Sequence, residues 1–402
     1  TPPEVDSMET IWWTAAAWLA LALLAALLGS WLRVSVALTE ILVGILSQLL
    51  MGVFGHTSLP GVRDGWVAFL AGTGSVVLTF LAGAELDPDA FRRRWKEATV
   101  MGLAGFLAPF LGAAWAARQV LGWAPQASWV AGVALSTTSV AVVYAVLLEL
   151  GINRTEYGKV ILAACFINDL GTVVALGLLF APFSWRTVVF VAALGVALWG
   201  CARAARPVLR RFAGRTSELE VKFLLGVLFA LGALAAWSGS EAVLPAYVLG
   251  MALAGTVGRH HELVRRLRSL TFGLLTPFYF IRAGLLVQLP VVAGGLGTFA
   301  VLFAAKALSK FAGVFPLTRA YRYARDEAMY TTLLMSTGLT FGTISSLYGL
   351  THGIIDQAQY SFLVSAVVAS AVVPTWIANR FFLPAHHVQQ AAPELALAPG
   401  GE

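Results

Sequence analysis

Charged residues are scarce in this sequence of 402 residues: Asp, Glu, Lys and Arg make up 12% of it, whereas 58% of the residues are hydrophobic. The mean hydropathy is +0.79. A water-soluble domain does not need so much apolar sequence. Apolar runs of about 18 to 25 residues recur along the chain, and each is long enough to cross a hydrocarbon layer of roughly 30 Å as a helix. The composition therefore predicts an all-α polytopic membrane protein.

Cysteine and histidine are also few, which argues against several classes of site. The two cysteines, Cys165 and Cys201, give neither a disulfide framework nor metal-ligand spacing. The stretch HHELVRR lacks the second histidine of a zinc-protease motif. An intramembrane aspartyl protease needs two membrane aspartates, and Asp169 alone qualifies. We therefore expect neither an enzyme nor a bound cofactor.

The hydropathy pattern predicts about thirteen membrane-spanning helices. We place them near 11–29, 34–54, 65–84, 98–118, 127–149, 157–180, 186–205, 219–238, 240–258, 270–288, 291–314, 326–350 and 357–382. If the N-terminus lies outside, 21 of the 27 Lys and Arg residues fall on inner segments, as retained cytoplasmic loops require. The distribution predicts an outer N-terminus and an inner C-terminus. The net charge of +6 then reflects topology and gives no reason to expect a nucleic-acid partner.

Away from the ends of the predicted spans, five charged residues remain inside the membrane: Glu40, Asp169, Arg282, Lys306 and Lys310. Each such charge costs at least about 2.5 kcal/mol at the bilayer centre, so pairing, water or function must retain it. Asp169 lies roughly 18 Å into its span, close to the midplane, beside Asn168. We expect Asp169 to be functional, with a structural pair between Asp169 and a lysine as the alternative. For Glu40 and Arg282 a structural ion pair is the first interpretation.

Two spans contain hydroxyl-rich interruptions. The fifth span carries LSTTSVAV at 135–142, and the twelfth carries STGLTFGTISS at 336–346. Ordinary hydrogen bonding of Ser and Thr to helical carbonyls is one explanation. The two spans have opposite orientation and lie seven helices apart, which suits inverted repeats made of spans 2–6 and 9–13. Broken helices in corresponding positions predict an ion site at the membrane midplane.

Several segments, in their shared order and spacing, resemble the monovalent cation/proton antiporters, in the branch with the NapA and Kef-type bacterial exchangers. The segments are TEILVGIL (39–46), LTFLAGAELDPDAFRRRWKEA (78–98), ALSTTSVAVVYAVLLELGINRTEYG (134–158), INDLG (167–171) and KFAG (310–313). The resemblance covers nearly all of residues 11–382. It implies an NhaA-like fold with two crossing broken helices, working as a homodimer in a bacterial inner membrane.

The resemblance also divides residues 1–382, a single transporter domain, into parts. The core would comprise about 98–180 and 291–382, the dimerisation panel about 11–84 and 219–288, and a linker helix about 186–205. Residues 383–402 would form a short cytoplasmic tail. The core would slide against the panel and expose one site alternately to each side.

Individual roles follow from the matched motifs. Asp169 would bind cation or proton with Asn168 beside it, and the first interruption would contribute Thr137, Thr138 and Ser139. Lys310 fits the motif as the positive partner, whereas Lys306 lies nearer the midplane of the predicted span, and both stay candidates. Accessory candidates are Glu40, Arg282, Gly338 and Thr340.

The chain departs from the pattern at one position that bears on stoichiometry. Several relatives carry two acidic residues where this chain has Asn168 and Asp169. A single carboxylate that chooses between one proton and one monovalent cation favours electroneutral exchange. Na+ is the first expectation for the cation, with K+ and Li+ as alternatives. A sodium-coupled symporter of an organic solute, on a related inverted-repeat fold, is the rival function.

Overall fold

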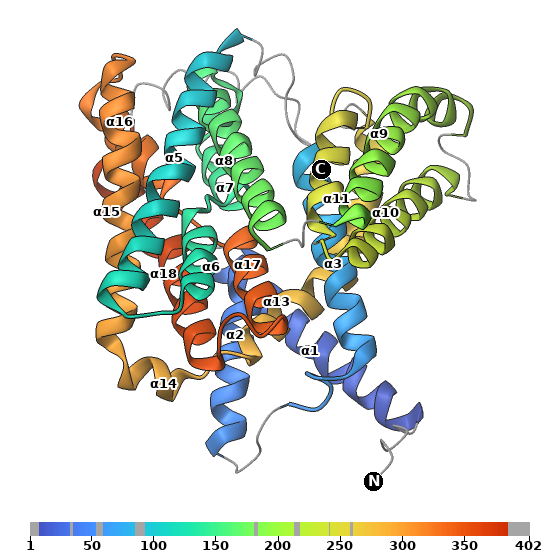
Figure 1. The fold of residues 1–402 in the computed structure, drawn as a ribbon, viewed down its shortest axis with the longest axis horizontal. Helices are drawn as coiled ribbons and strands as arrows, with labels where there is room; N and C mark the ends of the chain where they lie inside the picture. The colour runs from blue at the N-terminus through green and yellow to red at the C-terminus, as the bar shows by residue number, and fades with distance from the viewer. Residues whose placement is uncertain are drawn as a thin grey trace.

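The computed structural model describes residues 8–32, 35–53, 59–84, 93–180, 184–212, 218–240, 242–257 and 260–384. All regular structure in these residues is helical (Figure 1). Most of the predicted tail, and residues 85–92 of the motif at 78–98, lie outside the described residues.

The helices of the first half are α1 (Met8–Leu32), α2 (Val36–Val53), α3 (Gly65–Ala84), α5 (Trp95–Trp115), η1 (Ala116–Val120), α6 (Pro125–Ser136), α7 (Val140–Glu149), η2 (Ile152–Arg154), α8 (Glu156–Phe180) and α9 (Trp185–Phe212). Those of the second half are α10 (Leu219–Ser238), α11 (Val243–Leu253), α12 (His261–Leu270), η3 (Thr271–Leu275), α13 (Thr276–Leu285), α14 (Leu289–Gly294), α15 (Leu296–Ala320), α16 (Arg325–Met335), α17 (Thr340–Thr351) and α18 (Gln357–Phe381). Each predicted span contains a helix or a helix pair. Among the described residues, eight helices are long and apolar enough to cross a membrane.

One predicted span has wrong boundaries. The span predicted at 291–314 is divided at Gly295 into α14 and α15, and α15 continues to Ala320. The middle of α15 therefore lies between Lys306 and Lys310, so the depth argument that favoured Lys306 fails. The span predicted at 186–205 agrees with the apolar stretch Trp185–Ala204, which is long enough to cross a membrane, and its helix continues to Phe212.

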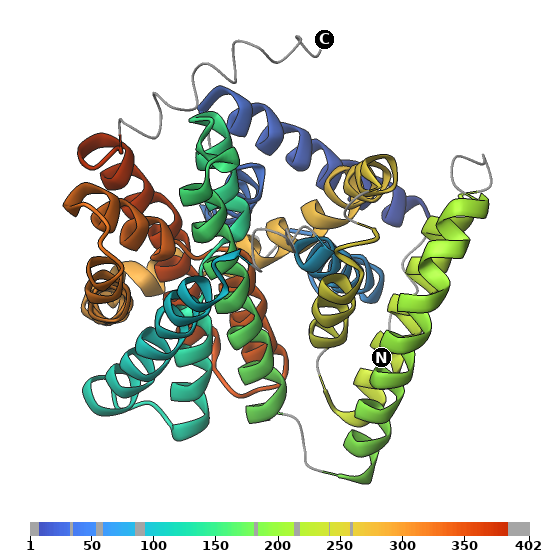
Figure 2. The same ribbon diagram turned by 90° about the horizontal axis from the view of Figure 1, so that it is seen from above.

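The helices gather into two groups (Figures 1 and 2). In the first group α5 packs on α6, α8 and α15, while α17 and α18 pack on each other and on α6. In the second group α2 and α3 pack on α13, α11 packs on α3, and α9 lies against α10 and α11. We call the first group the core group (α5–α8 and α14–α18) and the second the panel group (α1–α3 and α9–α13).

Two helix crossings in the panel group are made close by glycine. A Cβ on Gly284 of α13 would lie 2.1 Å from the Ile41 carbonyl oxygen of α2. A Cβ on Gly250 of α11 would lie 2.2 Å from the Phe80 carbonyl oxygen of α3. The backbones touch at both points because no side chain separates them. Each crossing joins one helix of the first half of the chain to one helix of the second half.

This close approach predicts opposite effects for the same substitution at two glycines. Gly284→Ala should destabilise the protein by about 1–3 kcal/mol, because the methyl group must push α2 and α13 apart. Gly226→Ala in α10 is the matched control, since a Cβ there meets no atom within 4 Å. The control should be neutral or stabilise by about 0.5–1 kcal/mol. Thermal unfolding of the detergent-purified variants measures both, and equal melting temperatures would contradict the close crossing.

Candidate functional site

Both predicted interruptions are real breaks in the helices. Helix α6 ends at Ser136 and α7 begins at Val140, with Thr137 in an extended conformation between them. The hydroxyls of Ser136 and Thr137 turn back and donate to the carbonyls of Val133 and Ala134. These bonds satisfy carbonyls that the broken helix leaves without an amide partner.

The second interruption is built in the same way. Helix α16 ends at Met335 and α17 begins at Thr340. The Ser336 hydroxyl donates to the Thr332 carbonyl, and the Thr337 hydroxyl donates to the Leu334 carbonyl. The hydroxyl-rich composition of both stretches therefore supports the ends of interrupted helices.

The two interruptions are joined directly. The Ser139 backbone N–H donates to the Thr337 carbonyl oxygen at 3.0 Å. The Thr138 hydroxyl donates to the Met335 carbonyl oxygen at 2.7 Å. Helices α6 and α17 pack on each other at this point. The bonds hold the ends of four half-helices together inside the core group.

Asp169 and Asn168 lie on α8 beside this crossing. The Asn168 side-chain amide donates to the Ser136 carbonyl oxygen at 3.3 Å, which links α8 to the end of α6. Asp169 is 1% exposed and Asn168 is fully buried. Among the described residues, neither Oδ1 of Asp169 nor Oδ1 of Asn168 has a hydrogen-bond partner. Two oxygens are thus available to a proton donor or to a hard cation.

The two lysines of α15 reach different atoms. The Lys310 amine donates to the Thr138 hydroxyl at 2.8 Å and interacts electrostatically with Asp169. The Lys306 amine donates to the Thr137 carbonyl oxygen at 3.2 Å. Both side chains are buried. The site therefore brings together Asp169, Asn168, the first interruption and both lysines, as their spacing along the chain indicates.

Two of the four accessory candidates lie at the second interruption, and the other two lie in the panel group. Gly338 lies inside the second interruption, and its carbonyl accepts a hydrogen bond from Ser370 at 3.4 Å. Thr340 is the first residue of α17 and is half-buried. Glu40 is buried on α2, in the panel group. Arg282 donates to the Val62 carbonyl at 3.0 Å. Among the described residues neither Glu40 nor Arg282 forms an ion pair.

One residue beside the site is missing from the sequence prediction. Tyr247 of α11 is buried, and its hydroxyl donates to the Phe166 carbonyl oxygen of α8 at 2.9 Å. Its ring meets Phe341 of α17 edge-on, with 5.7 Å between the ring centroids. Tyr247 is therefore a panel residue that contacts two helices of the core group, α8 and α17. Its only sequence signal is a tyrosine within an apolar run.

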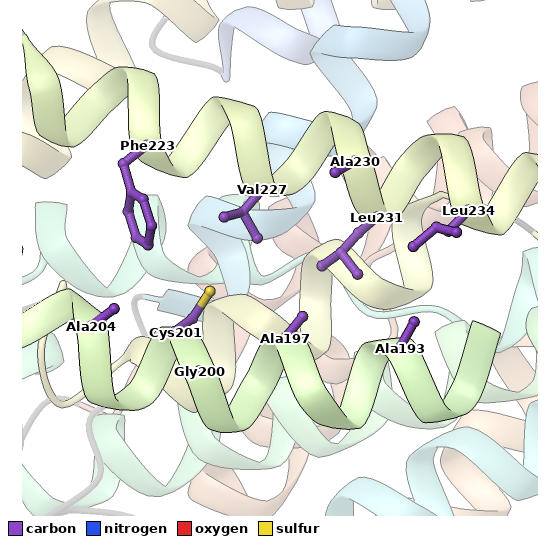
Figure 3. A pocket seen from close by; sticks show the side chains of 10 residues that line it. All are labelled: Ala193, Ala197, Gly200, Cys201, Ala204, Phe223, Val227, Ala230, Leu231 and Leu234. Carbon is purple, nitrogen blue, oxygen red and sulfur yellow. The ribbon is translucent and has the colours of Figure 1, made fainter. Parts of the chain in front are cut away.

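Open grooves lie away from this site. One groove of about 400 Å³ runs between α9 and α10 and is lined by apolar side chains and Cys201 (Figure 3). A second groove of about 450 Å³ lies beside η1 and includes Arg118 and Ser128. Neither groove includes a residue of the crossing, whose side chains are buried.

Comparison with known proteins identifies a family and several relatives with a similar sequence. The family profile described as sodium/hydrogen exchanger, transmembrane, matches residues 19–382. The chain is 26% identical to cation/H(+) antiporter 17 of Arabidopsis thaliana, over 80% of this chain and 42% of that protein. It is 24% identical to the probable Na(+)/H(+) antiporter 3 of Methanocaldococcus jannaschii, over 86% of this chain and 90% of that protein.

The fold also has a solved counterpart. The sodium proton antiporter MjNhaP1 of Methanocaldococcus jannaschii superposes with a TM-score of 0.68 at 16% identity, over 94% of this chain and 98% of that chain. The chain spans less than half the length of the plant relatives, but about nine-tenths of the archaeal relative. These relatives are transporters, and the symporter alternative finds no support among them. The family match, the all-helical fold and the intramembrane site agree: the chain belongs to the sodium/hydrogen exchanger family of membrane cation/proton antiporters.

Proposed function

We propose that this protein exchanges a monovalent cation, Na+ before K+ or Li+, for H+ at Asp169. The observation that carries the proposal is the pair of buried oxygens, Oδ1 of Asp169 and Oδ1 of Asn168, without partners beside two joined helix breaks. Family membership supports the exchange of a cation for protons. The roles of Asp169 and Asn168 are part of the proposal.

The chemistry of the site is competition for one carboxylate. A charged carboxylate buried within a membrane is costly, so Asp169 favours states in which a proton or a cation neutralises it. The proton converts Asp169 into a neutral acid. A cation in its place meets Oδ1 of Asp169 together with Oδ1 of Asn168. Because the two substrates need the same oxygen, binding of one expels the other.

Coupling requires the loaded site to face each side in turn. We propose an elevator movement of the core group against the panel group, with α9 as the linker. The division of helix packing between the two groups supports it. Among the described residues, the groups are joined by bonds to main-chain carbonyls, such as Tyr247 to Phe166 and Tyr360 to Ala283. Such bonds can be exchanged for others as one group slides.

The topology belongs to the same proposal. The basic residues of the inner segments support thirteen spans with an outer N-terminus. We propose in addition that the fold is an NhaA-like inverted repeat. The matched pairing of α2 with α13 and of α3 with α11 supports the repeat. A homodimer would use the panel group, where the exposed apolar face of α1 carries Trp12, Leu23 and Trp31. We place the protein in the inner membrane of a bacterium.

The proposed stoichiometry is one proton for one cation. One carboxylate at the crossing carries one proton or one cation, and Asn168 adds an oxygen without a second charge. The net charge moved in a cycle is then zero. An imposed membrane potential should leave the exchange rate unchanged.

Proteoliposomes test the function directly. Purified protein is reconstituted with an internal acid load and a pH-sensitive dye, and Na+, K+ or Li+ is added outside over a range of pH. We expect the cation to dissipate the proton gradient, most strongly with Na+. The rate should not respond to a potassium diffusion potential set with valinomycin. No response to any cation would defeat the proposal, and Na+-driven uptake of an organic solute would favour a symporter.

A further inference from the structure

Lys306 is a buried lysine in the middle part of α15. Its side chain is 1% exposed, and among the described residues no carboxylate forms an ion pair with it. Lys310, one turn further along α15, holds the Thr138 hydroxyl and interacts with Asp169. The two lysines therefore meet different groups although they share one face of α15.

The group that Lys306 meets is the end of a half-helix. Its amine donates to the Thr137 carbonyl oxygen, and Thr137 is the residue that follows the last turn of α6. The carboxyl end of a helix carries partial negative charge, to which a cation binds favourably. The dipole of α6 thus takes the place of a carboxylate as the counter-charge of Lys306.

The backbone of the second interruption also lies close to the amine of Lys306. A Cβ on Gly338 would lie 2.2 Å from Nζ of Lys306 and 2.8 Å from the Thr137 hydroxyl oxygen. Any side chain at 338 would therefore displace the lysine. Lys306 lies between the end of α6 and the backbone of the second interruption, in contact with both.

We propose that Lys306 is a positioning residue: a resident cation that fixes the two interruptions against each other and so holds Thr138 and Asn168 at the distances the transported cation requires. Thr138 follows the carbonyl that Lys306 binds, and Asn168 is bonded to Ser136 just before it. Gly338 is the space in which the ammonium lies. The consequence for cation affinity rests on the proposed function, whereas the structural role does not.

A double-mutant cycle tests the contact on the full-length purified protein. Gly338→Ala should lower the melting temperature, because the new methyl group collides with Nζ of Lys306. Lys306→Leu should lower it as well, because the end of α6 loses its counter-charge. Leucine removes Nζ and leaves only the contacts with Thr137, so Gly338→Ala should cost less stability beside leucine than beside lysine. If Gly338→Ala is as harmful beside leucine as beside lysine, the contact does not exist.

Transport kinetics test the positioning role. In Gly338→Ala and Lys306→Leu we expect the KM for Na+ to rise about tenfold, while the maximal rate falls less than about threefold. The pH of half-maximal exchange should not move. An altered pH midpoint at unchanged KM would show that Lys306 handles the proton instead, and unchanged KM and stability would remove its role.

Controls separate the possible failures. Lys222→Leu removes an exposed lysine of α10 and should leave the KM and the melting temperature as they are. Gly338→Ala retains the lysine, so it supplies the KM readout even where Lys306→Leu does not accumulate in membranes. If the wild-type protein shows no exchange, the proposed function fails, while the stability cycle still decides whether Lys306 fixes the crossing.

Discussion

We expect the substitution Asp169→Asn to abolish cation-driven proton exchange while the protein still folds. Asparagine has the size of aspartate but neither binds the exchanged proton nor carries the negative charge that attracts a cation. Because Oδ1 of Asp169 has no hydrogen-bond partner among the described residues, the loss of charge breaks no bond there. The change leaves the buried Lys310 without the carboxylate that it interacts with, so the melting temperature should fall although the fold is retained. Proteoliposome exchange and thermal unfolding measure the two effects.

The matched control is Asp356→Asn. Asp356 precedes α18, and its carboxylate accepts a hydrogen bond from the Gln359 backbone N–H at 2.7 Å. Asparagine caps a helix in the same way, so this variant makes the same chemical change outside the site. Its exchange rate should equal that of the wild type. Exchange that persists with its pH dependence in Asp169→Asn would show that another group carries the proton.

The site could be predicted from the sequence because its polar residues stand out within apolar runs. Asn168 and Asp169 interrupt an apolar run, and the hydroxyl stretches at 135–142 and 336–346 interrupt two others. Polar residues at membrane depth need partners, so their meeting in space could be predicted. The structure adds the bonds, such as Thr138 to Met335, that join the two breaks.

Other features depend on distances between helices that no local pattern reports. Lys306 and Lys310 are equivalent by spacing, and the offset of the two helix breaks decides which of them faces Asp169. Tyr247 reaches a main-chain carbonyl of α8 from a helix 81 residues away, so its role depends on the docking of the two groups. The ion pairs expected for Glu40 and Arg282 are not formed among the described residues, and sequence spacing gives no distance that could have shown this.

The charge of Lys310 should set the pH range of exchange. Two unit charges about 4 Å apart interact by about 4 kcal/mol at an effective dielectric constant of about 20, and the interaction falls in proportion as they separate. Lys310 interacts with Asp169 from the Thr138 hydroxyl, so its charge favours release of the proton from the carboxylate. Lys310→Gln removes that charge, and Asp169 then holds its proton more tightly. The cation competes only at lower proton concentration.

The expected result for Lys310→Gln is therefore a shift of the half-maximal pH toward alkaline values by about one unit or more, since one unit corresponds to about 1.4 kcal/mol. Lys310→Arg retains the charge and is the control: the tight packing around a fully buried side chain should lower its maximal rate, but its pH midpoint should stay. Measuring the rate against pH at saturating Na+ separates the two variants. A midpoint that stays in Lys310→Gln would mean that Lys310 supplies only the bond to Thr138. A shift toward acidic values would mean that Lys310 itself releases the proton, and this result would replace Asp169 as the origin of the pH dependence.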